Sequence, residues 1–351
     1  MDAIQTLLED LALSPPEDRQ ALRRAKARVA SRFGEPMIGN DALLLRYRED
    51  VAAGRRGRDP RLEDALMLNR IRSESGIATV TVITEPYACP GRCVYCPTEA
   101  RAPKSYLPNE PAVLRALRSD FDPHGQTCSR LEALAETGHA TDKIELIVKG
   151  GTWSFYPEEY QRRFIQQCVE AANGWGKGQE TRGKGDLEDT LTENEFAHAR
   201  IIGITIETRP DYVDEAEIRR LRMLGVTRVE LGVQTLEDSV LELIVRDHGT
   251  AEVRQATRLL KDAGIKVAYH IMPNLPGATP ESDLAHFRQV FDEPAYRPDT
   301  LKLYPCVVTE TAELNAWWRE GRYVPYDDET LVALLARMKL CVPPYVRIER
   351  V

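Results

Sequence analysis

The sequence predicts an α/β fold, a partial (β/α)6 barrel of six parallel strands preceded by a small helical region. Six short apolar runs alternate with longer stretches of helical periodicity, the pattern of strands joined by helical crossovers. The stretches 214–225 and 251–264 both end in glycine, a common helix terminator. The runs are largely apolar, as in a parallel sheet covered by helices. With 351 residues, the chain is long enough for one large barrel with an appendage, or for two domains.

The first segment has apolar residues at helical spacing, as at Ile4, Leu7, Leu8 and Leu11. We expect residues 1–72 to form a helical, basic N-terminal region and residues 73–351 to form the barrel. Residues 173–195 are rich in glycine and charge and predict a mobile insertion. The six strands are predicted at 78–84, 143–149, 200–207, 227–233, 265–271 and 299–305.

The formal net charge of -8 argues against a generally basic nucleic-acid binder, but the charge is unevenly placed. Residues 19–72 hold 14 Lys and Arg against seven Asp and Glu. Such a stripe suits contacts to phosphates, and an ordinary solvated helix face is the alternative. The chain has no apolar run of membrane-spanning length and no signal peptide, so we expect a soluble cytoplasmic protein with no membrane contact. The basic residues include Arg23, Arg24, Lys26, Arg28, Arg32, Arg55, Arg56, Arg58 and Arg61.

Three of the seven cysteines lie within eight residues, as a C-x3-C-x2-C sequence directly after the first predicted strand. An odd number of cysteines, so clustered, favours metal or redox chemistry over disulfides. Thiolates are the ligands of iron-sulfur clusters, and three of them leave one iron of a [4Fe-4S] cluster open. A zinc site is the alternative, but the chain has no second C-x-x-C or H-x3-H pair. The predicted cluster ligands are Cys89, Cys93 and Cys96.

This cysteine loop is similar to that of radical S-adenosylmethionine (SAM) enzymes. In those enzymes the open iron chelates SAM, and an electron from the cluster breaks a carbon-sulfur bond to give a 5'-deoxyadenosyl radical. Active sites of such barrels form at the loops that follow the strands. The motifs that begin just after each predicted strand are therefore candidates for the site.

Longer strings resemble the catalytic subunit of the Elongator complex and its prokaryotic relatives over about residues 70–350. This resemblance implies an acyltransferase that modifies the wobble uridine of tRNA. It also implies acetyl-CoA as co-substrate: the radical takes hydrogen from its methyl group, the carbon radical adds to C5 of uracil, and hydrolysis leaves a carboxymethyl group. The basic N-terminal region would then contact tRNA. The strings include TEPYACPGRCVYCPTEA, ITIETRPDY, TRVELGVQT, HIMPNLPGAT, RPDTLKLYP and ELNAWWREGRY.

The family continues into an acetyltransferase domain, and we expect that domain to be absent from this sequence, which stops at Val351. One alternative is therefore a tRNA-binding scaffold whose radical chemistry is idle without that domain. Another is a different radical SAM reaction, such as porphyrinogen oxidation or methylthiolation. In each enzymatic case an electron donor such as a ferredoxin or flavodoxin is required. The oligomeric state is not predicted.

Further site residues follow from similarity to radical SAM enzymes. Tyr95 is expected near the SAM adenine, and the glycine motif of Gly150, Gly151 and Thr152 near the SAM amino group. Their alternatives are a core tyrosine and a plain turn. Polar residues at the ends of the third, fourth and fifth strands and in the loop after the fourth are also expected to contact SAM. These are Glu207, Gln234, Arg246 for the methionine carboxylate and His270 for the ribose.

Two cations are expected at the mouth of the barrel, in ETRPD and KLYP. We predict that Arg209, Lys302 and the adjacent Tyr304 position RNA or acyl-CoA, with a structural ion pair as the alternative for each cation. Arg246 and His270 equally have structural alternatives, a salt bridge and a satisfied core histidine. An additional zinc is a weaker expectation, with Cys306 as the candidate ligand.

Overall fold

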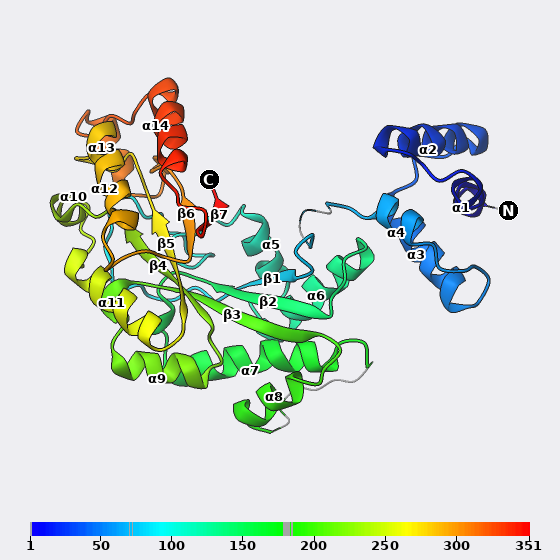
Figure 1. The fold of residues 1–351 in the computed structure, drawn as a ribbon, viewed down its shortest axis with the longest axis horizontal. Helices are drawn as coiled ribbons and strands as arrows, with labels where there is room; N and C mark the ends of the chain where they lie inside the picture. The colour runs from blue at the N-terminus through cyan, green and yellow to red at the C-terminus, as the bar shows by residue number, and fades with distance from the viewer. Residues whose placement is uncertain (1, 70, 72, 178–182, 184) are drawn as a thin grey trace.

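A computed structural model describes residues 2–69, 71, 73–177, 183 and 185–351. Its seven strands form one parallel sheet whose spatial order follows the chain order, curved into a half-barrel (Figure 1). All six predicted strands are confirmed. The strands are β1 (Ala78–Ile83), β2 (Lys143–Lys149), β3 (Arg200–Thr208), β4 (Arg228–Gln234), β5 (Lys266–Ile271), β6 (Thr300–Leu303) and β7 (Arg347–Arg350).

The seventh strand corrects the predicted number of six. Strand β7 pairs in parallel with β6 and lies at the end of the chain. Its four residues, Arg-Ile-Glu-Arg, carry three charges and are partly or fully exposed. An apolar-run search misses such a strand because neither its length nor its composition is that of a buried strand.

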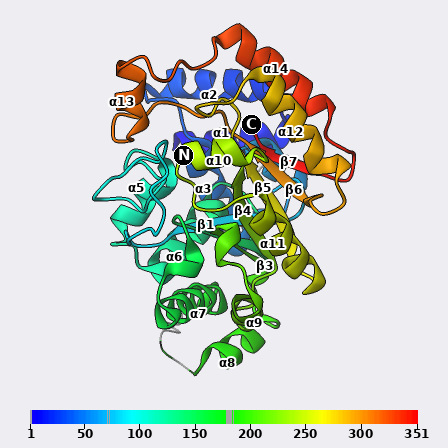
Figure 2. The ribbon, with the colours of Figure 1, turned by 90° about the vertical axis from the view of Figure 1, so that its left-hand side faces the viewer.

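Helices cover the outer face of the half-barrel (Figure 2). Val229 and Leu231 of β4 face this layer and belong to the main hydrophobic core with Val253 and Leu260 of α11. The alternate residues of β4 therefore point into the barrel. The helices after β1 are α5 (Pro111–Arg118), α6 (Pro123–Glu136), α7 (Glu158–Gly174), α8 (Leu187–Asn194), α9 (Glu215–Met223), α10 (Asp238–Leu243), α11 (Thr250–Asp262), α12 (Pro280–Asp292), α13 (Leu314–Arg319) and α14 (Asp328–Leu340). Short 3-10 turns are η2 (Trp153–Phe155) and η3 (Pro210–Tyr212).

Four helices precede the sheet and pack around a separate apolar cluster, which includes Leu7, Leu43 and Leu62. They join the barrel through the turn before β2, where Arg48 donates to the Ala135 carbonyl and the Leu68 amide donates to the Thr137 carbonyl. That turn lies at the amino end of the strands. The domain boundary at residue 72 stays a prediction. The helices are α1 (Ala3–Leu13), α2 (Arg19–Phe33), α3 (Asn40–Ala52) and α4 (Pro60–Leu66).

The predicted insertion over 173–195 is described in part, since residues 178–182 and 184 lie outside the described residues. Helix α8 falls within it and begins at the N-cap Asp186, whose side chain accepts from the Asp189 amide. Asn194 ties this helix to β3, because its carboxamide donates to the Ala199 carbonyl and accepts from the Ile201 amide. No helix among the described residues is both long and apolar enough to cross a lipid bilayer.

Candidate active site

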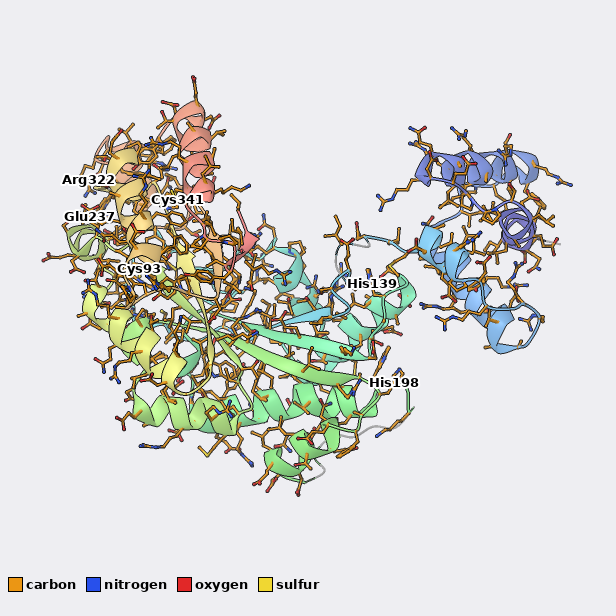
Figure 3. The ribbon with its side chains drawn as sticks, viewed as in Figure 1. Cys93, His139, His198, Glu237, Arg322 and Cys341 are labelled. Atoms are coloured by element: carbon orange, nitrogen blue, oxygen red, sulfur yellow. The ribbon has the colours of Figure 1, made fainter. Side chains whose placement is uncertain are left out.

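The cysteine loop leaves the carboxyl end of β1 and is fixed to two other segments. The Val94 amide donates to the Ile244 carbonyl at the end of α10, and the Leu314 amide donates to the Val94 carbonyl. Cys93 and Cys96 are buried, while Cys89 is half-buried. Figure 3 shows Cys93 on the side of the barrel remote from helices α1–α4. The predicted ligands thus lie where parallel barrels place their active sites.

Each cysteine sulfur lies near a polar group of the fold. The Ser105 hydroxyl is 3.0 Å from Cys96 Sγ, and Thr152 Oγ1 is 3.8 Å from Cys89 Sγ. Burial raises the pKa of the Cys96 thiol to about 11. Because a metal ligand must be the thiolate, binding of a metal or cluster here would release a proton.

The motif after β2 needs its two glycines because neighbouring chain segments lie too close for a side chain. A Cβ on Gly150 would lie 1.7 Å from Thr84 Oγ1 at the end of β1, and one on Gly151 would lie 3.3 Å from the Lys104 carbonyl. The φ angles of +151° and +86° also disfavour any other residue. Thr152 follows and is buried beside Cys89. The motif therefore packs the second strand end against the cysteine loop, and its contact with SAM stays a prediction.

Arg246 lies inside the site, so a surface salt bridge is not its role. Its Nη2 donates to the Gly232 carbonyl at 2.6 Å, and Nη1 lies 3.4 Å from Cys93 Sγ. Gln234 lies nearby and has a positive φ of 72°. Among the described residues, Arg246 Nε and Gln234 Oε1 are buried without hydrogen-bond partners. Buried polar atoms are seldom left unpaired, so these two are open to a polar ligand.

Tyr95 is buried next to these groups. Burial raises the pKa of its hydroxyl well above the ordinary value, although the Arg246 charge opposes this. The ring packs in a small apolar cluster with Leu241, Ile244 and Leu275. This packing fits a core tyrosine, and the expected contact of Tyr95 with the SAM adenine stays a prediction.

A layer of charged side chains fills the barrel beneath these loops. The Lys149 ammonium lies 2.6 Å from Glu207 Oε1 and 3.7 Å from Glu230 Oε2. The Lys302 ammonium pairs with Glu230 and lies 4.0 Å from Glu207 Oε1. Strands β2, β3, β4 and β6 thus contribute two ammonium groups and two carboxylates, whose charges balance one another. A polar interior of this kind is unlike the packed core usual in closed barrels.

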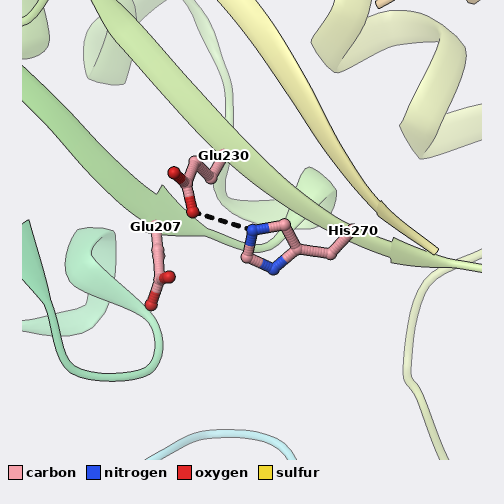
Figure 4. A group of neighbouring side chains, drawn as sticks. All are labelled: Glu207, Glu230 and His270. Atoms are coloured by element: carbon pink, nitrogen blue, oxygen red, sulfur yellow. Dashed lines mark hydrogen bonds and ion pairs between the residues drawn. The ribbon is translucent and has the colours of Figure 1, made fainter. Parts of the chain in front are cut away.

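His270 of β5 completes the layer, as Figure 4 shows. Its Nε2 lies 2.8 Å from Glu230 Oε2, and its ring meets the Tyr304 ring edge-on at 5.3 Å. Burial lowers the pKa of His270, although the hydrogen bond with Glu230 opposes this. Burial alone would raise the pKa of Glu230, but the charge of Lys149 and the contacts of His270 and Lys302 hold it well below its ordinary value.

The ligand atoms of Glu207, Glu230 and His270 all lie within 4.8 Å of one another, a spacing that a metal ion would accept. Two ammonium groups already neutralise the two carboxylates. A cation would have to displace them, so we assign no metal to this layer. Cys306, the expected zinc ligand, is buried and belongs to none of the groups of three potential ligands found in the described part of the chain.

Arg209 and Lys302 are both buried in ion pairs, which is the structural alternative stated for each cation, and their contact with RNA or acyl-CoA stays a prediction. Arg209 is 3% exposed and forms a bidentate ion pair with Asp211. Its Nε lies 2.9 Å from Oδ1 and its Nη2 lies 2.8 Å from Oδ2. Lys302 is 7% exposed and paired with Glu230. Both cations are therefore partly neutralised by the fold, because a buried charge requires a partner.

Sequence reasoning missed Lys149, Glu230 and Tyr106. Tyr106 follows the cysteine loop, and its hydroxyl donates to Glu207 Oε2. Glu230 was not recognised as a candidate site residue. Both faces of β4 are buried, so its sequence does not alternate polar and apolar residues in a way that marks the inner face. Lys149 could have been predicted from the sequence. It is the last residue of β2, and Glu207 is the last but one of β3, so both lie at the carboxyl edge of the sheet.

Comparison with known proteins decides the family. Residues 86–290 match the radical SAM superfamily. The chain belongs to the radical SAM superfamily. Residues 298–351 match the radical SAM C-terminal domain. Membership implies a [4Fe-4S] cluster and SAM, and the site fits both. Three cysteines in one loop suit the cluster, and the buried Arg246 Nε and Gln234 Oε1, which have no hydrogen-bond partner among the described residues, suit a polar ligand such as SAM.

Relatives of this radical SAM chain confirm the predicted resemblance. A tRNA uridine(34) acetyltransferase of Dehalococcoides mccartyi is 49% identical over 280 residues, which are 80% of this chain and 60% of the relative. Elongator complex protein 3 of Bos taurus is 36% identical over 346 residues, 94% of this chain and 60% of the relative. The solved archaeal Elp3 of Methanocaldococcus infernus, with residues 1–46 deleted, superposes with a TM-score of 0.67 at 38% identity, covering 79% of this chain and 56% of that one. The chain thus spans just over half of these relatives.

Proposed function

We propose that this chain carries the radical SAM part of a reaction that adds an acetyl-CoA-derived carboxymethyl group to C5 of the tRNA wobble uridine in the cytoplasm. The observation that carries the proposal is the Tyr106–Glu207 hydrogen bond. It joins the segment after the cysteine loop to Glu207 of the charged layer, so that the proposed cluster site and the polar interior of the barrel adjoin. The names of the relatives, tRNA uridine(34) acetyltransferase among them, support uridine in tRNA as the substrate.

Cys89, Cys93 and Cys96 would hold the cluster, which with bound SAM supplies the 5'-deoxyadenosyl radical. Ser105 and Arg246 place polar hydrogens near the sulfurs of Cys96 and Cys93 and so stabilise negative charge there. The surrounding apolar packing keeps water from these thiolates.

Other residues of the strand ends would bind and orient the reactants. Gly150, Gly151 and Thr152, with Tyr95, line the approach to the cysteines and are proposed SAM contacts. Arg246 Nε and Gln234 Oε1 offer a donor and an acceptor to the methionine part of SAM.

The charged layer would receive the uracil and the acyl group. Glu207 and His270 belong to this layer and lie on the two strands that flank β4, and we assign them to positioning SAM and substrate. Arg209, Lys302 and Tyr304 position RNA or acyl-CoA. Arg209 also lies close to the cysteine loop, since a Cβ on Gly91 would lie 2.2 Å from its Nη1.

The test is anaerobic reconstitution with iron and sulfide, followed by incubation with SAM, acetyl-CoA, tRNA and a reduced ferredoxin or flavodoxin. Nucleoside mass spectrometry should reveal a carboxymethyl group on the wobble uridine. SAM cleavage without any change in the tRNA would contradict the proposal and favour a different radical SAM reaction. Binding of tRNA without SAM cleavage would contradict it too and favour an idle tRNA-binding scaffold. Omission of acetyl-CoA is the matched control, because it should abolish the modification.

A further inference from the structure

Three aromatic rings meet on the surface at the carboxyl end of the strands. Tyr87 follows β1, Phe155 follows β2 and Tyr212 follows β3. The centroids of Tyr87 and Phe155 are 6.0 Å apart, and those of Phe155 and Tyr212 are also 6.0 Å apart. Tyr87 is 43% exposed and Phe155 is 37% exposed, although large apolar rings are usually covered.

The rings are anchored rather than loosely attached. Tyr87 stacks on Tyr156 at 4.9 Å, Tyr156 stacks on Tyr160 at 4.9 Å, and Tyr160 packs against the core residue Phe164 at 5.7 Å. The buried Tyr156 hydroxyl donates to the Glu85 carbonyl and lies 2.8 Å from Thr84 Oγ1. A ligand that stacks here meets a surface already ordered, so binding loses little conformational entropy.

The rings border the proposed active site. Tyr87 is two residues from Cys89, and Phe155 is three residues from Thr152, whose hydroxyl lies 3.8 Å from Cys89 Sγ. The Arg209 guanidinium lies 5.8 Å from the Tyr212 ring centroid. The same connection after β1 carries cations that suit a polyanion, namely the exposed Arg92 and Arg101 and the half-buried Lys104.

We propose that Tyr87, Phe155 and Tyr212 form a stacking platform for an unpaired base of the RNA substrate, next to the base that is modified. The inference rests on the proposed function and adds where the RNA is held. Single-stranded RNA is recognised chiefly by bases stacked on aromatic side chains, with cations along the backbone. The basic helices α1–α4 join the barrel at the amino end of the strands, so the base near the cysteines needs a separate surface.

The test measures binding of an anticodon stem-loop RNA to the full chain over a range of salt concentrations. In the double variant Tyr87→Leu, Phe155→Leu we expect about tenfold weaker binding, since the stacking of one base on an aromatic ring is lost. The slope of log Kd against log salt should not change, because no phosphate contact is lost. Tyr87→Phe keeps the ring and should keep the affinity.

Phe196→Leu is the matched control, because Phe196 is 86% exposed but precedes β3, at the other end of the sheet. As a second readout, 2-aminopurine beside the wobble position should be quenched by the wild type and by Tyr87→Phe but not by the leucine variant. Wild-type affinity and quenching in the leucine variant would overturn the platform alone. If the wild type failed to bind the stem-loop, the proposed function would fall, and the platform with it.

Discussion

The loops at the carboxyl end of the strands differ sharply from the four helices at the start of the chain. The loops enclose buried charges and unpaired polar atoms, such as Arg246 Nε and Gln234 Oε1 among the described residues. In the helices, the polar side chains largely satisfy one another: Arg55 pairs with Asp50, and Arg58 with Glu63. Unsatisfied groups mark where a ligand is expected, so the chemistry belongs to the barrel.

The basic stripe of the helices is smaller in the structure than in the sequence. Lys26 is buried, its ammonium donates to Asn40 Oδ1 at 2.8 Å, and burial lowers its pKa. Arg23, Arg24 and Arg28 remain exposed on α2. Arg32, Arg55, Arg58 and Arg61 are exposed as well, so the helical region keeps most of its basic residues at the surface.

The largest expected effect concerns the cysteine loop. Cys93→Ala should remove a cluster ligand, so iron bound after anaerobic reconstitution should fall to background while the circular dichroism spectrum stays that of the folded protein. Cys341→Ala is the control, since this thiol lies at the C-cap of α14, outside the cysteine loop, and donates to the Arg337 carbonyl. Full iron content in the Cys93 variant would refute the ligand assignment.

The charged layer should give the next largest effect. Glu230→Gln removes the carboxylate paired with Lys302 and leaves Glu207 as the one carboxylate that the Lys149 and Lys302 ammoniums share. We expect this to lower the free energy of unfolding by about 3 kcal/mol at pH 7. The folded pKa of Glu230 lies below its usual 4.5, so its stabilisation is present above that pH and is lost as the pH falls below it.

Urea unfolding of the wild type and of Glu230→Gln at pH 7 and at lower pH checks this prediction. The difference between their free energies of unfolding should become smaller in acid. Glu320→Gln removes an exposed pair with Arg322 and should change stability by less than about 0.5 kcal/mol. A pH-independent gap for Glu230→Gln would show that its charge does not stabilise the fold.

A glycine pair offers a smaller and more local test. Gly150→Ala collides with Thr84 between the first two strand ends, whereas Gly34→Ala places its Cβ in open space at the C-cap of α2, with a φ of +65°. We expect thermal unfolding to show a loss of about 2–3 kcal/mol for the first and about 1 kcal/mol for the second. Equal losses would mean that the contact with Thr84 does not restrict this site.

The smallest effect should come from the helices. Replacing Arg23, Arg24 and Arg28 by Ala should weaken stem-loop RNA binding several-fold and flatten its salt dependence, while SAM cleavage continues. Filter binding at several salt concentrations measures this. If neither the affinity for the stem-loop RNA nor its salt dependence changed, this face of α2 would be an ordinary solvated surface without RNA contacts.

The sequence was enough to predict what depends on local pattern. The adjacent glycines after β2 and the three closely spaced cysteines after β1 could be recognised from the sequence, because each motif consists of residues that are close together in the chain. The partner of Lys302 was not predictable, since Glu230 lies 72 residues away and only the fold brings them together, whereas Asp211 is only two residues from Arg209. Strand β7 was missed because its stability comes from pairing with β6 rather than from its own composition.

The most direct test of the central claim is the yield of 5'-deoxyadenosine from SAM after anaerobic reconstitution and reduction. The account predicts 5'-deoxyadenosine from the wild type and from Cys341→Ala, and none from Cys93→Ala. A reconstituted wild type that binds no iron and forms no 5'-deoxyadenosine would contradict the assignment of Cys89, Cys93 and Cys96 as the ligands of a radical-generating cluster.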